Sequence, residues 1–421
     1  MPWTETCVME ERIKFVMEVL DSTYTMAELS RYYNISRKTG YKWLSRYQQF
    51  GIKALSDLSR APHNHPNAIS PQIQQAMLSI KKEFPRWGAP KIRNRLERTH
   101  PDWKCYPAIS TIGLFLHKQG LTVPRKRRRR ATPTESPLTK GIRSNDVWCA
   151  DFKGHFKTAD GCRCNPLTIS DHSSRYLLCC HHLDRTRQGE GLAVALVSYE
   201  LVKMRFERVF RKYGLPDVIR TDNGSPFASR GIGGLSRLSY WWIRLGIYPE
   251  RIEPGHPEQN GRHERMHKTL KDHTARPPAK TLTQQQKRFN EFCAEYNEHR
   301  PHEALEMRTP AECYCGSNRE FPSRLSQLIY PEDMLVRRVH NHGDILYFGR
   351  RLFLTESLRG EDVGIEQLSE DVSRLWYCDY LLGEIDHRKW QIAPAKSRSL
   401  ICAYAQISDY KPGKVLPMSS V

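Results

Sequence analysis

Residues 217–227 read D-V-I-R-T-D-N-G-S-P-F, an apolar run that ends in Asp222 and is followed directly by the turn signal Asn223–Gly224. Residues 147–151, V-W-C-A-D, repeat the pattern and end in Asp151. Either aspartate alone would be an ordinary turn residue. Because buried carboxylates need a positive partner, two of them at strand ends predict a shared cation, and oxygen ligands favour Mg²⁺.

A third carboxylate lies in N-G-R-H-E-R-M-H-K-T-L-K, residues 260–271. Asn260 and Gly261 are expected to begin a helix, which puts Glu264 in its first turn, where the helix dipole favours the ionised form. Lys268 and Lys271 follow on the same face as Glu264. They form either an ordinary solvated pair with the glutamate or a grip on a DNA backbone.

The pattern between residues 147 and 299 predicts an α/β domain. Expected strands cover 147–153, 167–171, 175–183 and 217–222, and expected helices cover 189–213, 234–245, 261–274 and 284–299.

Five short segments together resemble the conserved blocks of the retroviral-integrase-like transposases of bacterial insertion sequences. They are W-C-A-D-F from Trp148, R-T-D-N-G-S-P-F from Arg220, P-E-Q-N-G-R-H-E-R from Pro257, Y-N-E-H-R-P-H-E-A-L from Tyr296 and T-P-A-E-C-Y from Thr309. The resemblance covers roughly residues 8–316. It implies an RNase H-like catalytic core over residues 146–316, with a central mixed sheet and helices on both faces.

The resemblance also implies roles for individual residues. Asp151, Asp222 and Glu264 match the family's catalytic triad, which holds two Mg²⁺ ions, with Mn²⁺ as a substitute. Lys268 and Lys271 match basic positions that contact the DNA end in related integrases. The implied reaction is hydrolysis at the ends of an element and strand transfer into target DNA. Because two ends of double-stranded DNA must be held together, we expect a homo-oligomer, a dimer or larger.

Spacing and motif disagree about the third carboxylate. Between Asp222 and Glu264 lie 41 residues, whereas the family's common arrangement has about 35, which fits Glu258. Surface loops absorb insertions at little cost, while the geometry of a helix start does not change. The motif therefore predicts Glu264, with a short insertion around R-G-I-G-G-L-S-R, residues 230–237. The zinc-binding N-terminal domain of retroviral integrases is missing, which favours a transposase.

The net charge of +20 and the isoelectric point near 9.5 predict a polyanionic partner, with nucleic acid ahead of a membrane surface. Residues 1–140 hold 25 lysines and arginines against 11 aspartates and glutamates. No apolar run approaches the roughly 20 residues that span a bilayer, and the N-terminus does not resemble a signal peptide. We therefore expect a cytoplasmic protein without a membrane partner, associated with the nucleoid in a bacterium.

Residues 1–60 predict a helix-turn-helix DNA-binding domain. An apolar period over 9–20 marks one helix, and T-M-A-E from Thr25 is a capping box for a second. Ser36 is expected to cap a third, base-reading helix. Its predicted DNA-binding residues are Arg37, Lys38, Lys42 and Arg46.

Residues 69–121 predict a second helical domain, with helices at 71–84, 89–98 and 109–118. Its basic residues, among them Lys91 and Arg95, indicate either a second DNA-binding surface or a merely solvated face. Residues 122–145 form a basic linker in which Arg125 and Arg127 belong to P-R-K-R-R-R-R. That run is either a nuclear localisation signal or, as charge alone favours, an arm that follows DNA phosphates.

Beyond the core, alternation and turns over residues 330–386 predict a small β-barrel, and residues 388–421 carry no readable signal. The twelve cysteines fit a reduced compartment. A zinc site built from Cys162, Cys164, His181 and His182 is an alternative to the preferred interpretation, small side chains buried in a sheet.

Two other functions compete with a transposase. One is a helix-turn-helix regulator whose second half only oligomerises, which would have no use for three clustered acids. The other is an RNase H-like nuclease that cuts without joining. Two DNA-reading modules favour binding to specific ends over that nuclease.

Overall fold

The computed structural model describes residues 7–58, 68–122, 138–152, 154–183, 199–229 and 231–395, except for the side chain of residue 257. The chain divides into two compact units, residues 1–75 and 76–421. Arg125 and Arg127 of the predicted arm lie outside the described residues. Within those residues, no helix has the length and apolar character that crossing a membrane requires.

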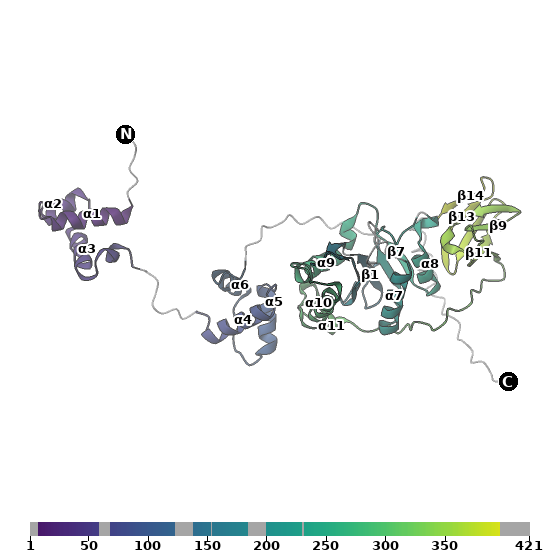
Figure 1. Ribbon diagram of the computed structural model, residues 1–421, viewed down its shortest axis with the longest axis horizontal. Coiled ribbons are helices and arrows are strands. Elements are labelled where there is room, and N and C mark those ends of the chain that lie inside the picture. The colour runs from purple at the N-terminus through teal and green to yellow at the C-terminus, as the bar shows by residue number, and fades with distance from the viewer. Residues whose placement is uncertain are drawn as a thin grey trace. The chain divides into compact units, whose positions relative to one another are not determined.

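The N-terminal unit is a three-helix fold (Figure 1) made of α1 (Val8–Leu20), α2 (Met26–Tyr32) and α3 (Arg37–Phe50), followed by the 3₁₀ turn η1 (Ile52–Leu55). The predicted capping box is confirmed, since Thr25 and Glu28 cap each other's backbone amides. Trp43 of α3 lies in a core with Phe15, Val16, Leu29 and Leu55. A Cβ atom at Gly40 would lie 2.8 Å from the Phe15 ring and from Met26 Sδ, so a larger residue there would force these side chains to shift.

Three further helices make up the second helical block, α4 (Pro71–Glu83), α5 (Ala89–Thr99) and α6 (Ile109–Lys118). Phe84 and Trp87 stack between α4 and α5 with their ring centroids 3.9 Å apart. Trp87 is fully buried. Ile92 and Leu96 of α5 are fully buried as well, which gives this block an apolar interior of its own.

A five-stranded mixed sheet follows, in the order β5-β4-β1-β6-β7. Its strands are β1 (Val147–Phe152), β4 (Pro166–Asp171), β5 (Leu177–His182), β6 (Val218–Thr221) and β7 (Tyr248–Arg251). β1 pairs antiparallel with β4 and parallel with β6. A small hairpin, β2 (Phe156–Lys157) and β3 (Arg163–Cys164), stands apart from this sheet.

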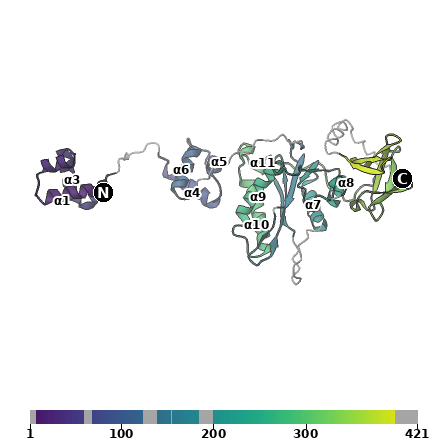
Figure 2. The same cartoon turned by 90° about the horizontal axis from the view of Figure 1, so that it is seen from above.

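Helices cover both faces of the sheet (Figure 2). On one side lie α7 (Tyr199–Tyr213) and α8 (Arg237–Arg244), and on the other α9 (Gly261–Thr274) and α10 (Leu282–Ala294). α10 runs into a π-helical turn, η4 (Glu295–His299), and α11 (Pro310–Cys313) follows. The apolar core behind α7 and α8 includes Trp148, Phe206 and Trp242. A second apolar cluster, including Leu270, Phe289 and Phe292, seats α9 and α10. The expected mixed α/β core is thereby confirmed.

The C-terminal strands form two antiparallel sheets in the part of the chain that is described. The larger sheet has the order β14-β13-β12-β11-β8, and β9 pairs with β10. The bounds are β8 (Leu335–Arg338), β9 (Asp344–Tyr347), β10 (Arg350–Phe353), β11 (Asp362–Gln367), β12 (Val372–Tyr377), β13 (Tyr380–Asp386) and β14 (Gln391–Pro394). The strand pairing does not close them into the predicted barrel. β14 lies in the stretch for which the sequence offers no prediction.

Helix α8 is buried on two sides. Leu238 and Trp242 pack into the core under the mixed sheet. Tyr240 and Ile243, together with the preceding Leu235, belong to the apolar core of the C-terminal sheets. The predicted insertion before α8 contains the 3₁₀ turn η2 (Ile232–Gly234) and packs there as well.

Candidate active site

Asp151 and Asp222 leave neighbouring strands at the same edge of the sheet. Asp151 lies near the end of β1, and Asp222 directly follows β6. The two strands run parallel with Ala150 opposite Thr221, so the two aspartates are the next residues in that register. The backbone amide of Gly224 donates to Asp222 Oδ1 over 3.1 Å, which fixes the carboxylate at the turn.

Helix α9 lies against Asp151. The side-chain amide of Asn260, just before the helix, donates from Nδ2 to Asp151 Oδ2 over 3.5 Å, and Nδ1 of His267 lies 3.7 Å from the same oxygen. Since each helical residue turns by about 100°, Glu264 projects within about 60° of His267 on α9. Glu264 itself is exposed.

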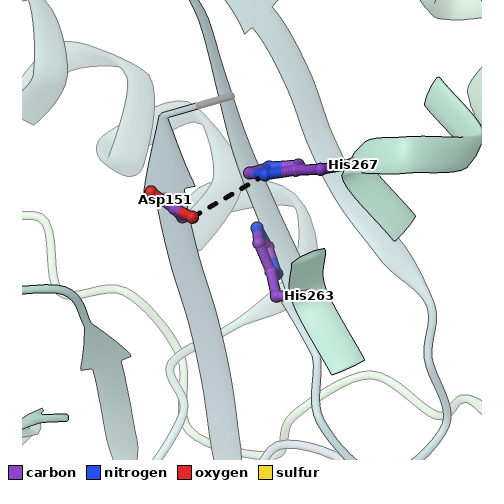
Figure 3. A group of neighbouring side chains, drawn as sticks. All are labelled: Asp151, His263 and His267. Carbon is purple, nitrogen blue, oxygen red and sulfur yellow. Dashed lines mark ion pairs between the residues drawn. The ribbon is translucent and has the colours of Figure 1, made fainter. Parts of the chain in front are cut away.

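The tightest group of metal-ligating atoms contains two histidines. Among the described residues, candidate ligand atoms of Asp151, His263 and His267 lie within 4.8 Å of one another, and neither Asp222 nor Glu264 belongs to this group. Figure 3 shows both imidazoles reaching from α9 toward Asp151 on β1. The structure therefore places the predicted acids on converging elements but draws only Asp151 into a close cluster.

A buried hydroxyl joins the two histidines. Thr168 lies opposite Asp151 on β4. Its Oγ1 donates to the Asp151 carbonyl oxygen over 3.0 Å and lies 2.7 Å from His263 Nε2 and 2.6 Å from His267 Nε2. Ser170 Oγ is 2.9 Å from His263 Nδ1, and burial lowers the pKa of His263 to about 3, so this imidazole is neutral. Sequence reasoning missed this network, although the i, i+4 pair of histidines around Glu264 was its visible signal.

A buried ion pair stands two residues before Asp222. Arg220 Nε donates to Glu250 Oε2 on the neighbouring β7 over 2.6 Å, and both side chains are almost wholly buried. Thr139 completes the pair, because its amide and hydroxyl donate to Glu250 Oε1 and its carbonyl accepts from Arg220 Nη2. Through Thr139, the segment before β1 is thus tied to β6, the strand that Asp222 directly follows.

The predicted DNA-binding residues of α3 and α9 lie on the surface. Arg37, Lys38 and Lys42 are exposed, and Arg46 is partly exposed. Lys42 Nζ and Arg46 Cζ each lie 5.0 Å from the centroid of the Trp43 ring, so cation–π contacts hold both near the same helix face. Lys268 and Lys271 of α9 are exposed as well.

The basic residues of α5 are placed differently. Lys91 donates from Nζ to the carbonyl oxygen of Pro301, and burial lowers its pKa to about 7. Arg95 Cζ lies 5.9 Å from the Phe84 ring centroid. Arg98 donates to both carboxylate oxygens of Glu312, over 2.8 and 3.2 Å. These residues have partners within the chain, and the DNA contacts predicted for Lys91 and Arg95 stay predictions.

Glu258, the alternative third carboxylate, lies in the 3₁₀ turn η3 (Pro257–Asn260) ahead of α9. It is exposed and pairs with His256 Nδ1 over 2.7 Å, a contact that raises the pKa of His256. The turn sets it outside the helix that faces Asp151.

The zinc alternative finds no matching cluster in the described ranges. His181 Nδ1 lies 2.6 Å from the carbonyl oxygen of His182, and His182 Nδ1 lies 3.1 Å from Gln286 Oε1. Cys164 is fully buried between the hairpin and the apolar cluster under α9. The preferred interpretation of small side chains buried in the fold describes it better.

Comparison with known proteins identifies domains that match this arrangement. Residues 142–257 and 245–310 match two families that are both described as Integrase core domain. Residues 11–63 match the family Helix-turn-helix domain, and residues 39–116 match Homeodomain-like domain.

Two insertion-element proteins are similar to much of the chain. An uncharacterized 31.7 kDa protein of insertion element IS407 from Burkholderia multivorans is 26% identical over 257 residues, which covers 60% of this chain and 83% of that protein. An uncharacterized 39.2 kDa protein of insertion element IS476 from Xanthomonas euvesicatoria is 25% identical over 266 residues, which covers 61% of this chain and 70% of that protein.

A solved structure of the HTLV-2 integrase catalytic core domain in complex with magnesium is 17% identical, covers 41% of this chain and 99% of that one, and has a TM-score of 0.29.

Proposed function

This chain joins helix-turn-helix domains to an integrase core domain and is similar to insertion-element proteins, and on that premise we propose that it is a DNA transposase. It would bind the ends of its element, hydrolyse a phosphodiester bond there, and join the exposed 3′ hydroxyls to target DNA. The observation that carries the proposal is the departure of Asp151 and Asp222 from neighbouring parallel strands beside α9, the helix that bears Glu264.

The residues at this edge fit divalent cations. Asp151, Asp222 and Glu264 offer carboxylate oxygens, the ligands that Mg²⁺ prefers, and Mn²⁺ accepts the same set. When bound, two such cations activate the attacking water or hydroxyl and stabilise the leaving oxygen. The exposure of Glu264 leaves this carboxylate accessible to a cation and a DNA strand together.

The surrounding residues would hold the DNA. Lys268 and Lys271 follow Glu264 on α9 and would contact phosphates beside the cleavage point. Arg37, Lys38, Lys42 and Arg46 of α3 would read the sequence of the element ends. Arg125 and Arg127 of the basic linker would add nonspecific contacts to DNA phosphates. The C-terminal sheets would contribute further DNA or subunit contacts.

The reaction brings two element ends to one target, so a single copy with one catalytic edge does not suffice. We infer a homo-oligomer, a dimer or larger, assembled on double-stranded DNA. Light scattering of the protein with and without end DNA would show whether assembly depends on the DNA.

The test uses the full chain, Mg²⁺ and labelled DNA from the flanks of the gene, and scores nicked and joined products separately. Asp222→Asn and Glu264→Gln should abolish both products while end binding stays near normal, because each removes a charge that holds the cation. Glu258→Gln is the matched control and should keep most activity. Chelation with EDTA should stop the reaction, and added Mg²⁺ or Mn²⁺ should restore it.

The outcomes also separate the rival functions. Nicked DNA without joined products would indicate a nuclease, and selective binding without either product would indicate a regulator. Loss of activity in Glu258→Gln with retention in Glu264→Gln would reverse the assignment of the third carboxylate.

A further inference from the structure

Two histidines of α9, in addition to the predicted carboxylates, lie close to Asp151. His263 and His267, spaced one helical turn apart on α9, are both almost wholly buried, with 2% and 5% of their surface exposed. Their ring nitrogens and the Asp151 carboxylate approach within 4.8 Å (Figure 3). Resting on the proposed function, we propose that His267 supplies a nitrogen ligand to the cation held by Asp151, through its Nδ1 atom.

His263 does not compete for this role. Its Nδ1 lies 2.9 Å from Ser170 Oγ and its Nε2 lies 2.7 Å from Thr168 Oγ1, so both ring nitrogens are engaged by hydroxyls of β4. It acts as a positioning residue, because it packs against His267 with ring centroids 4.6 Å apart and shares the Thr168 hydroxyl with it.

The hydrogen bonds of the Thr168 hydroxyl fix the orientation of the His267 ring. A threonine hydroxyl has one proton and two lone pairs. Thr168 gives its proton to the Asp151 carbonyl oxygen, since a carbonyl only accepts, and both histidine Nε2 atoms must then donate to Thr168 Oγ1. His267 Nε2 thus carries a proton, and Nδ1, which lies 3.7 Å from Asp151 Oδ2, is the ring nitrogen that a cation would use.

The separation of the two atoms suits one bound ion. Two ligands that are each about 2.1 Å from a cation, at angles of 90–120°, lie about 3.0–3.6 Å apart. Nδ1 of His267 is 3.7 Å from Asp151 Oδ2, so a shift of a few tenths of an ångström brings both into range.

The ligand set has a consequence for the choice of metal. Imidazole nitrogen favours transition metals, whereas Mg²⁺ prefers oxygen. A site formed by Asp151 and His267 should therefore bind Mn²⁺ more tightly than Mg²⁺. Thr168 acts behind the ligand, and losing such an outer partner typically lowers metal affinity about 10–100-fold.

The test is pulsed electron paramagnetic resonance of the full chain loaded with Mn²⁺, which detects nitrogen-14 bound directly to the metal and needs no catalysis. The wild type should show this nitrogen coupling, and labelling its histidines with nitrogen-15 should change it. His267→Asn should remove the coupling and weaken Mn²⁺ binding about tenfold or more. Thr168→Val should weaken Mn²⁺ binding while Mg²⁺ binding changes less.

His273→Asn is the matched control, since His273 also lies on α9 beside a carboxylate, with its Nδ1 3.2 Å from Glu295 Oε2. It should keep the nitrogen coupling. Wild-type protein that binds Mn²⁺ without nitrogen coupling, or coupling that survives His267→Asn, would overturn the proposal. Joined DNA without nitrogen coupling defeats this inference alone, whereas nitrogen coupling without any DNA product defeats the proposed function alone.

Discussion

Helices α3 and α5 are both basic, and from the sequence both are candidates for contact with DNA. In α3 the basic residues Arg37, Lys38 and Lys42 are exposed. In α5, Lys91 is directed at the Pro301 carbonyl and Arg98 at Glu312 of α11, both in the segment that follows α10. One helix offers its charge to the solvent, and the other uses it inside the chain.

A basic helix face is therefore not by itself a DNA-binding signal. A guanidinium or ammonium group pairs with any acceptor within reach, and the core supplies such acceptors opposite α5. Trp87 strengthens the same contact, because its Nε1 donates to Glu295 Oε1 over 3.1 Å. The second helical block therefore also supports the core. Four experiments test whether the basic residues of α3 serve DNA binding and those of α5 serve stability.

The largest effect is expected from removal of residues 1–60. Selective binding to element ends should be lost, by about 10³-fold or more relative to unspecific DNA, because α3 carries the exposed basic residues. The melting temperature of the remaining unit should not change, since residues 1–60 lie within one compact unit, residues 1–75, and residues 76–421 form the other. Competition gel shifts and calorimetry measure both, and retained preference for the ends would move recognition away from α3.

Trp87→Ala should act on stability instead. Removing a fully buried tryptophan typically costs about 3–5 kcal/mol of unfolding free energy. Denaturant melts should show this loss, while end binding at low temperature stays near normal. Trp103→Ala is the control, because Trp103 is only partly buried on His100 and should cost less. Equal losses for both variants would mean that α5 does not support the core.

Lys91 should make stability depend on pH. Burial holds its folded pKa at about 7, below the value of about 10.4 in an unfolded chain, so the unfolded chain binds more protons between these values. Stability should therefore rise as pH increases from 7 toward 10, by at most about 1–2 kcal/mol after solvent screening. Lys91→Met should lose this rise. Parallel pH profiles for the two proteins would show that the ammonium group is solvated.

The smallest effect is expected at Arg98. Its partner Glu312 is 44% exposed, and surface pairs typically contribute about 0.2–1 kcal/mol. A double-mutant cycle with Arg98→Ala and Glu312→Ala should give a coupling energy in this range that falls with added salt. A coupling above 2 kcal/mol would indicate that this contact, and not Trp87, holds α5 to the core.

Local signals predicted the helices and central strands well. The capping box at Thr25 and the helix start at Asn260–Gly261 depend on neighbouring residues alone, so the sequence states them directly. β7 escaped prediction because Y-P-E-R contains Pro249, a residue that strands tolerate mainly at a sheet edge, where β7 lies. The C-terminal strands were predicted, but their pairing forms two sheets and not the predicted barrel, since strand pairing depends on distant partners.

The candidate site was only partly predictable, because it too depends on residues that are distant in the sequence. The ends of two apolar runs marked Asp151 and Asp222 as candidates, with a turn signal after Asp222, and a helix start marked Glu264. Thr168 gave no signal, because its role exists only where β4 brings it under both histidines. The internal use of Lys91 likewise depends on Pro301, more than two hundred residues away along the chain.

Helix α8 constrains how such a protein can evolve by exchange of parts. Its residues are shared between two cores, Trp242 in one and Tyr240 and Ile243 in the other. Recombination that replaced the C-terminal sheets alone would leave one apolar side of α8 without a matching surface. A successful exchange must carry α8 and the preceding insertion along, so the exchangeable part begins inside the α/β core, well before the first strand of the C-terminal sheets.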